Sequence, residues 1–371
     1  MIYSSAPQRG ASAEQGRDVE AGARLALDDA GEKAGKFKIR YVALDDTGDK
    51  GRWDPARVSA NARRAVANAR TIAYIGELDP GASAISIPIL NKAGILQVSP
   101  LDSAEGLTRT DGAGPGEPDK YYPSKDRNFA RVVPADHVQA AAAATYMKVR
   151  GVTKVYLVGD RSGYGTSLGR QVADRVKDGG VAIAGSDSFA PGTTDFASLT
   201  SKIEASGADA VYVSADEPSD AASFVRSLHA AAPQLSVFGP SRLAVPAFTK
   251  AIGPAGSVTF LTRPTLDPKL YPPKAGSVFK AFEARYGRPG RPEALYGYEA
   301  MAALLEAIKA AGDAGNDRKA VTQAFFATKN RESVLGTYSI DGDGDTSLTD
   351  YGGYRVRSGA PLFDRVLPPA G

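Results

Sequence analysis

The chain has 371 residues, of which 43% are hydrophobic and 23% charged, and its formal net charge is +3. This length exceeds that of one ordinary hydrophobic core and predicts two or three compact units of globular composition. The small net charge argues against a nucleic-acid-binding protein, which needs a concentrated basic face. The chain contains no cysteine, which excludes disulfides, thiol catalysis and thiolate metal sites.

Short β-rich runs alternate with helical patterns through the first third of the chain. Strands are predicted at 2–4, 37–44, 72–76 and 95–99, and helices at 14–30, 55–69 and 83–93. The segment 111–126 is rich in Gly, Pro and charge and predicts an exposed loop.

The residues after Met1 lack the basic and apolar regions of a signal peptide. We therefore expect either a cytoplasmic protein or one whose secretion segment precedes this sequence.

A second series of the same kind follows. Its strands are predicted at 155–159, 181–188, 210–214 and 236–239, and its helices at 136–150, 164–179, 195–206 and 218–231. Two similar series of alternating strands and helices predict two α/β lobes, each with a parallel sheet. The last third, with a strand at 258–261, helices at 276–286 and 293–311 and a turn-rich end from Gly336, is predicted to add to both lobes. A buried stripe is expected on its second helix at Tyr298, Met301, Leu305 and Ile308.

The stretch GDRSGYGTSLG at 159–169 joins a predicted strand to a predicted helix. It lacks the lysine of a Walker loop, and its glycines at 163, 165 and 169 are one residue off the dinucleotide-binding spacing. Nucleotide binding is therefore disfavoured. A helix N-terminus of this kind favours a small anion such as a carboxylate. Loops at the carboxyl ends of parallel strands are also where open α/β sheets bind ligands.

The chain shows no pattern of a catalytic or metal site, and no cofactor is expected. No set of nucleophile, base and acid is apparent, and His137 and His229 stand in separate predicted helices without a partner at metal-ligand spacing. The motif DGDGD at 341–345 resembles the start of a calcium loop, but Thr346 replaces the required glycine and Gly352 the bidentate glutamate. We predict a hairpin turn there and a protein that is not an enzyme.

Several segments, spread over almost the whole length, resemble the leucine/isoleucine/valine-binding family of type I periplasmic solute-binding proteins. They include IYSSAPQRG, AYIGELDPGASAISIPILNKAGILQVSP, NFARVVPADHVQ, KVYLVGDRSGYG and YGYEAMAALLEAI. None is a strict motif, but their order and spacing together are specific. The resemblance implies two Rossmann-like lobes with parallel sheets flanked by helices, joined by three crossover segments. Lobe 1 would comprise 1–131 and 262–336, and lobe 2 would comprise 132–261 and 337–371.

The resemblance also implies a function. Members of the family are receptors of ABC importers, periplasmic or extracellular, with or without a lipid anchor, and act as monomers. They capture an amino acid or a similar small polar ligand in the cleft between the lobes by hinge closure, and then dock on a membrane permease. A cytoplasmic ligand-sensing regulator with the same two lobes is the alternative. Regulators of that kind that are transcription factors carry a helix-turn-helix module ahead of the lobes, and none precedes the first strand here.

The ligand shell of the family transfers to this chain one residue at a time. Tyr164 matches a cleft tyrosine, Ser103 with the backbone of Asp102 matches the turn that holds the head group, and Ser83 opens a helix that faces the ligand carboxylate. Pro80 stands where family members have a further serine. Side-chain pocket positions correspond to Tyr296 and Gln15.

The chain departs from the family at the acid that pairs with the ligand ammonium. Ser241, beside Arg242, occupies that position, and Asp216 and Glu217 are the candidate replacements. Simpler roles are open for each: Tyr164 as a surface residue, Ser83 as a helix N-cap, Arg242 as a solvated loop charge, and Asp216 and Glu217 as the start of a helix. The missing acid weakens the case for leucine, isoleucine or valine and leaves aromatic and non-amino-acid ligands open.

Overall fold

The computed structural model describes residues 1–10, 12–49 and 51–368. The chain divides into two compact units. Unit 1 comprises Met1–Ala135 and Asp267–Leu348, and unit 2 comprises Asp136–Leu266 and Thr349–Gly371. The chain therefore passes from one unit to the other near residues 135, 266 and 348, in each case later than the positions 131, 261 and 336 expected from the sequence.

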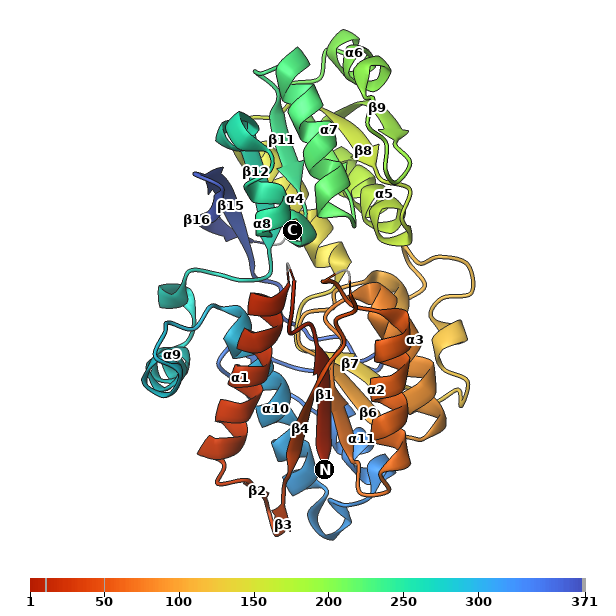
Figure 1. The fold of residues 1–371 in the computed structure, drawn as a ribbon, viewed down its shortest axis with the longest axis vertical. Helices are drawn as coiled ribbons and strands as arrows, with labels where there is room; N and C mark the ends of the chain where they lie inside the picture. Colours follow the sequence, from red (N-terminus) through yellow and green to blue (C-terminus); the bar gives the residue numbers. More distant parts are fainter. Residues whose placement is uncertain (11, 50, 369–371) are drawn as a thin grey trace. The chain divides into compact units, whose positions relative to one another are not determined.

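Unit 1 is built on a parallel sheet with helices on both faces (Figure 1). Its strand order is β4 (Tyr41–Asp45), β1 (Ile2–Ala6), β5 (Ala73–Ile75), β6 (Leu96–Ser99) and β7 (Phe129–Arg131). One face is covered by α2 (Pro55–Ala67) and α3 (Pro80–Lys92), and the other by α1 (Ala13–Asp29), α10 (Glu293–Ala310) and α11 (Arg318–Phe326). The α9 helix (Pro273–Tyr286) packs against α1. The order reverses at β1, so the loops after β1 and β5 flank a topological switch point.

The helices α1 and α10 pack unusually closely. A side chain at Gly22 would come within 1.9 Å of the Ala294 carbonyl oxygen, and one at Gly297 within 1.9 Å of the Val19 carbonyl oxygen. Only glycine allows this approach of two backbones. The predicted stripe on α10 is confirmed, since Tyr298, Met301, Leu305 and Ile308 are all buried.

The helices α2 and α3 each begin at a proline that follows an aspartate in the cap position. The Asp54 carboxylate accepts hydrogen bonds from the amides of Ala56 and Arg57 at the start of α2. Asp79 and Pro80 occupy the cap and first positions of α3, so this helix begins at Pro80. The prediction that Ser83 opens the helix, or caps it, is wrong, because proline with its fixed φ starts the helix three residues earlier.

Unit 2 contains a sheet in the order β16 (Ala360–Leu367), β15 (Tyr351–Arg357), β12 (Thr259–Arg263), β11 (Ser236–Gly239), β10 (Ala210–Ser214), β8 (Lys154–Gly159) and β9 (Ala182–Ser188). The strands β8 to β12 run parallel, whereas β15 and β16 form an antiparallel hairpin at one edge. Helices α4 (Asp136–Val149) and α5 (Gly163–Asp178) contact each other, as do α6 (Ala197–Ala205), α7 (Pro218–Ala231) and α8 (Pro246–Thr249) in sequence order.

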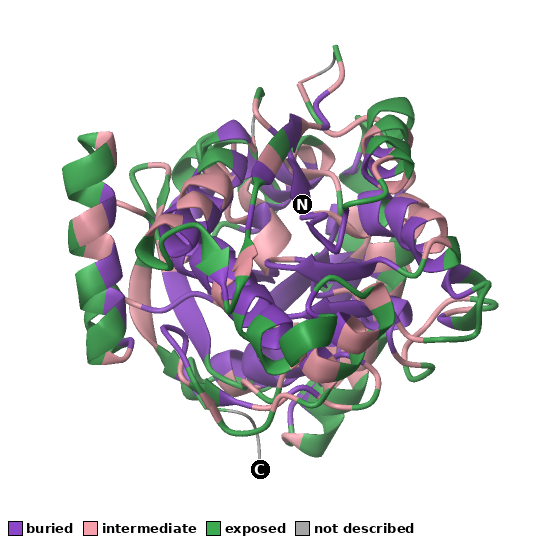
Figure 2. Cartoon of the chain, turned by 90° about the horizontal axis from the view of Figure 1, so that it is seen from below, coloured by how far each residue is buried: buried purple, intermediate pink, exposed green. Residues whose placement is uncertain are grey.

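Some elements differ from the sequence prediction. The single strand expected at 37–44 is split, because β3 (Phe37–Lys38) folds back on β2 (Lys33–Ala34) and only β4 joins the sheet. The turn-rich end instead contains the β15–β16 hairpin, and α11 was not predicted. The loop at 111–126 is not wholly exposed, since Tyr121 and Tyr122 are buried against Ile87 of α3. Across the described residues, the buried positions gather on the strands and the inner helix faces (Figure 2).

Candidate functional site

The strand order of the unit 2 sheet reverses between β8 and β10. The loops that follow these two strands, at the carboxyl edge of the sheet, therefore flank a topological switch point. Asp160, directly after β8, ties these loops together. Its buried carboxylate accepts hydrogen bonds from the amide and hydroxyl of Ser162 and from the amides of Asp216 and Glu217. Ser162 in turn caps α5 by accepting from the Gly165 amide at 2.8 Å. The glycine-rich stretch is thus a fixed strand-to-helix turn.

Three of the predicted site residues lie together at this edge. The Arg242 guanidinium stands 5.2 Å from the centre of the Tyr164 ring, a cation–π distance, and its Nε is 2.7 Å from Asp216 Oδ1. Arg242 is largely covered, with 20% of its side chain exposed, whereas Asp216 has 46% exposed. Arg242 is therefore not a solvated loop charge but a charge with a defined position.

Gln139 on α4 holds this cluster in place through hydrogen bonds to Tyr164 and Ser241. Sequence analysis did not identify this residue. The side chain is fully buried. Its Nε2 donates to the Tyr164 hydroxyl at 3.2 Å and to Asp136 Oδ1 at 3.1 Å, while its Oε1 accepts from the Ser241 amide at 2.8 Å. The signal that could have revealed it is a lone amide side chain in the otherwise alanine-rich run of α4.

Replacing Gln139 with leucine is expected to lower the unfolding free energy of unit 2 by about 1–3 kcal/mol, because the Ser241 amide and the Tyr164 hydroxyl would lose a buried partner. Calorimetric unfolding would measure the change. Lys148→Ala, at an exposed position of the same helix, is the matched control and should leave the transition nearly unchanged. Equal transitions for the two variants would contradict the bridging role of Gln139.

Tyr164 is half-buried at its ring, and its hydroxyl end is enclosed. Burial, followed by the nearby Asp136 carboxylate, raises the pKa of Tyr164 well above its ordinary value, although Arg242 acts in the opposite direction. The hydroxyl therefore stays protonated at neutral pH. Tyr164 is accordingly a fixed aromatic surface with a satisfied hydroxyl, and not a loosely held surface residue.

The other predicted residues of unit 2 occupy supporting positions. Glu217 caps α7, since its carboxylate accepts from the amide and hydroxyl of Ser219. The simpler role considered for Glu217, the start of a helix, is thus observed, while its part in ligand binding stays a prediction. Ser241 begins the short turn 241–243 after β11 and is half-buried.

The predicted residues of unit 1 lie at several elements of its own carboxyl edge. Ser83 is fully buried, and its hydroxyl has no hydrogen-bond partner among the described residues. Asp102 is nearly fully buried; its amide donates to Ser99 Oγ, and its carbonyl accepts from Arg131, so its backbone is used to build the turn. The remaining three are Ser103 in the same turn, the half-buried Gln15 in the first turn of α1 and the buried Tyr296 on α10.

A buried group of carboxyls adjoins this edge of unit 1. Asp46 and Glu77 follow β4 and β5, and both are almost fully buried. Burial and neighbouring negative charges raise the pKa of Asp46 to about 7 and that of Glu77 well above its ordinary value. Burial, followed by the negative charges of Asp46 and Asp45, raises the pKa of Glu20 on α1 to about 8. The Tyr74 hydroxyl donates to Glu77 Oε1 at 2.8 Å.

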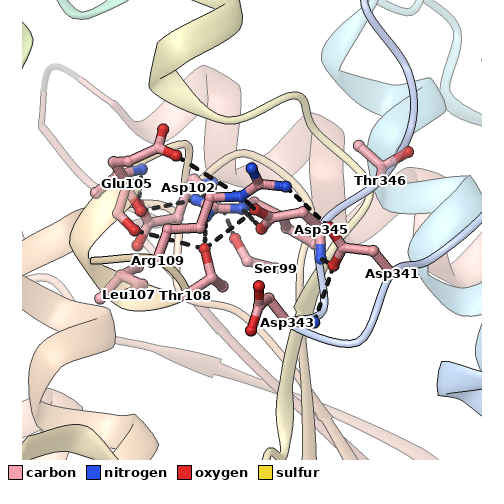
Figure 3. A network of polar contacts seen from close by, with 12 residues as sticks. Ser99, Asp102, Glu105, Leu107, Thr108, Arg109, Asp341, Asp343, Asp345 and Thr346 are labelled. Atoms are coloured by element: carbon pink, nitrogen blue, oxygen red, sulfur yellow. Dashed lines mark hydrogen bonds and ion pairs between the residues drawn. The ribbon is translucent and has the colours of Figure 1, made fainter. Parts of the chain in front are cut away.

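A second polar network in unit 1 explains the DGDGD motif (Figure 3). Asp345 Oδ1 is 2.7 Å from Nε of the fully buried Arg131, and Asp345 Oδ2 is 2.7 Å from Nε of Arg109. Arg109 also reaches Asp341 at 2.9 Å. An antiparallel bridge between Ile340 and Thr346 confirms the predicted turn. Asp345 is thus the ion-pair partner of Arg131 and Arg109. Among the described residues, no group of side chains is suited to hold a metal ion.

Comparisons with known proteins agree with this architecture. A family described as periplasmic binding protein matches residues 4–360. The Leu/Ile/Val-binding protein BraC3 of Rhizobium johnstonii is 26% identical over 360 residues, covering 95% of this chain and 90% of that protein. The crystal structure of leucine binding protein LivK from Thermotoga maritima superposes with a TM-score of 0.81 at 22% identity, covering 99% and 98% of the two chains.

A third relative has a ligand of another kind. The solute binding protein of an ABC transporter from R. palustris, in complex with benzoate, has a TM-score of 0.76 at 21% identity and covers 100% of this chain and 96% of its own. None of the described helices is both long and apolar enough to cross a membrane. The protein is a solute-binding protein and not an enzyme. The match over nearly its whole length shows that the chain belongs to the periplasmic binding protein family, as a type I member of the branched-chain amino acid group.

Proposed function

We propose that this protein is an extracytoplasmic receptor of an ABC importer that captures an amino acid or a similarly small polar ligand. The observation that carries the proposal is the cluster of Tyr164, Asp216 and Arg242, which lies at a topological switch point of a chain that matches the family over residues 4–360. Such edges present backbone amides and polar side chains to small molecules. Relatives named as Leu/Ile/Val-binding proteins support the importer role.

The proposed mechanism is hinge closure. A ligand that touches groups of both units makes additional contacts in the closed state. The population therefore shifts toward the closed state to the extent that the ligand binds this state more tightly than the open state. The unit 1 contribution would come from Ser83, Ser103, Gln15 and Tyr296, and that of unit 2 from Tyr164 and Arg242. The closed receptor would then dock on the permease of the importer.

A thermal-shift screen tests the receptor function. A ligand at 100 times its dissociation constant should add about 2.7 kcal/mol of stability and raise the melting temperature by several degrees. Amino acids, small carboxylates, amides and aromatic acids would be compared with a neutral sugar at equal ionic strength. Mass spectrometry of the denatured protein would first establish that no ligand is already bound. Ligand-free protein that is stabilised by none of these compounds would contradict the proposal.

A further inference from the structure

The carboxylates near the unit 2 switch point are already engaged within the protein. Asp160 accepts four hydrogen bonds from the two adjoining loops. Glu217 caps α7 through Ser219, and the buried Asp136 accepts from Gln139. Asp216 is paired with Arg242. An ammonium group brought to this edge would have to compete for a carboxylate that has a protein partner.

The carboxylates of unit 1 nearest its own switch point are either bonded within the protein or almost fully buried. Asp45 accepts from the Arg9 guanidinium and from the amides of Gln8 and Thr47. Asp102 accepts from the Ala104 amide. Asp46 and Glu77 are almost fully buried behind the edge. Asp46 Oδ1 and Glu77 Oε2 have no hydrogen-bond partner among the described residues, but both carboxyls are almost fully buried. A ligand ammonium at this edge would therefore meet carboxylates that are either bonded within the protein or buried, and a charged group without a partner in a closed site is costly.

The positive charge at the unit 2 edge is, by contrast, held at a fixed position. Arg242 lies against the Tyr164 ring, and that ring is anchored through its hydroxyl by the buried Gln139. Gln139 also holds the amide of Ser241, the residue before Arg242. A guanidinium positioned in this way is suited to a carboxylate, because its planar fork matches the two oxygens. Its present partner, Asp216, has nearly half of its side chain exposed to solvent.

We infer, resting on the proposed function, that the ligand is a small organic acid without an ammonium group, whose carboxylate binds the guanidinium of Arg242 beside the Tyr164 ring. This assigns Arg242 as the residue that determines specificity. It assigns Asp216 as a competitor that the ligand displaces or joins, and Gln139 as a positioning residue. Removing the charge of Asp216 distinguishes this arrangement from an amino-acid site. Ligand affinity should rise if Asp216 competes for Arg242, and it should fall if Asp216 binds a ligand ammonium.

Matched ligands test the inference on the complete protein. Titration calorimetry would compare leucine with 4-methylpentanoate, phenylalanine with 3-phenylpropanoate, and leucine amide as an ammonium without a carboxylate. Each acid is expected to bind at least about tenfold more tightly than the amino acid with the same carbon skeleton, since the unpaired ammonium is costly. An amino acid that binds more tightly than its matched acid would overturn the inference and leave the receptor function standing. Binding of none of the amino acids, acids and amides would overturn both.

Variants then assign the residues. Arg242→Gln should weaken acid binding roughly 10–100-fold, and Arg242→Lys should recover part of it, because lysine restores the charge without the fork. Asp216→Asn should tighten acid binding about threefold or more by removing a competing negative charge. Arg226→Gln, on an exposed arginine of α7 that bonds the Ala251 carbonyl, is the matched control and should leave affinity unchanged.

The same variants also define the results that would contradict the assignment. Weaker binding by Asp216→Asn, or unchanged acid affinity in Arg242→Gln, would overturn the assignment. Calorimetric unfolding of each variant shows that an observed loss is not a failure to fold. Because Asp216→Asn is expected to gain affinity, the inference also has a readout that misfolding cannot produce.

Discussion

Replacing Asp345 with alanine is expected to lower the unfolding free energy of unit 1 by about 3–5 kcal/mol, because it leaves the buried Arg131 guanidinium without its counter-charge. Arg131 is fully buried, and Asp345 is 2.7 Å from it and from Arg109. Burial alone would raise the pKa of Asp345, but the two arginines hold it below its ordinary value. The melting temperature of unit 1 should fall by roughly 10 °C.

Fluorescence can follow this change in unit 1 alone. The chain has a single tryptophan, Trp53, whose ring lies against Gly81 at the start of α3. Asp343→Ala is the matched control in the same turn, since Asp343 is half exposed and stands 3.7 Å from Arg127. An exposed pair of this kind is worth less than about 1 kcal/mol. Similar losses in Asp345→Ala and Asp343→Ala would show that the turn, and not the buried ion pair, determines the stability.

The buried carboxyls of unit 1 are expected to make it less stable as the pH rises from about 5 to 8.5. The folded-state pKa of Asp46 is raised to about 7 and that of Glu20 to about 8, so the folded protein binds more protons than the unfolded chain between about pH 4 and these values. The unfolding free energy must therefore decrease with pH in this window. Asp46 alone accounts for a decrease on the order of 3 kcal/mol.

Asp46→Asn should flatten this pH dependence, because the amide cannot ionise at either pH. Denaturant unfolding at pH 5 and pH 8.5, followed by Trp53 fluorescence, measures the two free energies. The gain of the variant over the unaltered protein should be larger at pH 8.5 than at pH 5. Asp49→Asn, at an exposed position of the same loop, is the control. A pH slope that is identical in Asp46→Asn and Asp49→Asn would refute the prediction.

Much of the secondary structure could be predicted because its signals are local. The helix at 218–231 and the strands at 210–214 and 236–239 have the bounds expected from apolar runs and from the proline and glycine beside them. The β15–β16 hairpin was missed although Ser358 and Gly359, both with positive φ, form its turn. Its glycine-rich first strand weakens the alternation, and its pairing with β12 depends on a segment about ninety residues away.

The candidate site could be predicted only in part from the sequence. Tyr164, Asp216 and Arg242 were each proposed from family resemblance, but no pattern showed that a guanidinium would lie on the tyrosine ring and pair with the aspartate. Gln139 contacts Ser241 across 102 positions of sequence. A contact over that separation leaves no periodic signal, since only the sheet and its helices bring the two segments together.

The alternation of strands and helices and the resemblance to the family could both be read from the sequence. These follow from residue type and short-range spacing, which act on the backbone directly. Tertiary structure alone decided where the chain leaves unit 1 for the last time, since Asp345 binds Arg131 across 214 positions and keeps the turn in unit 1. It also decided which carboxylates are satisfied. Burial and partners set the charge of a side chain, and both are properties of the folded protein.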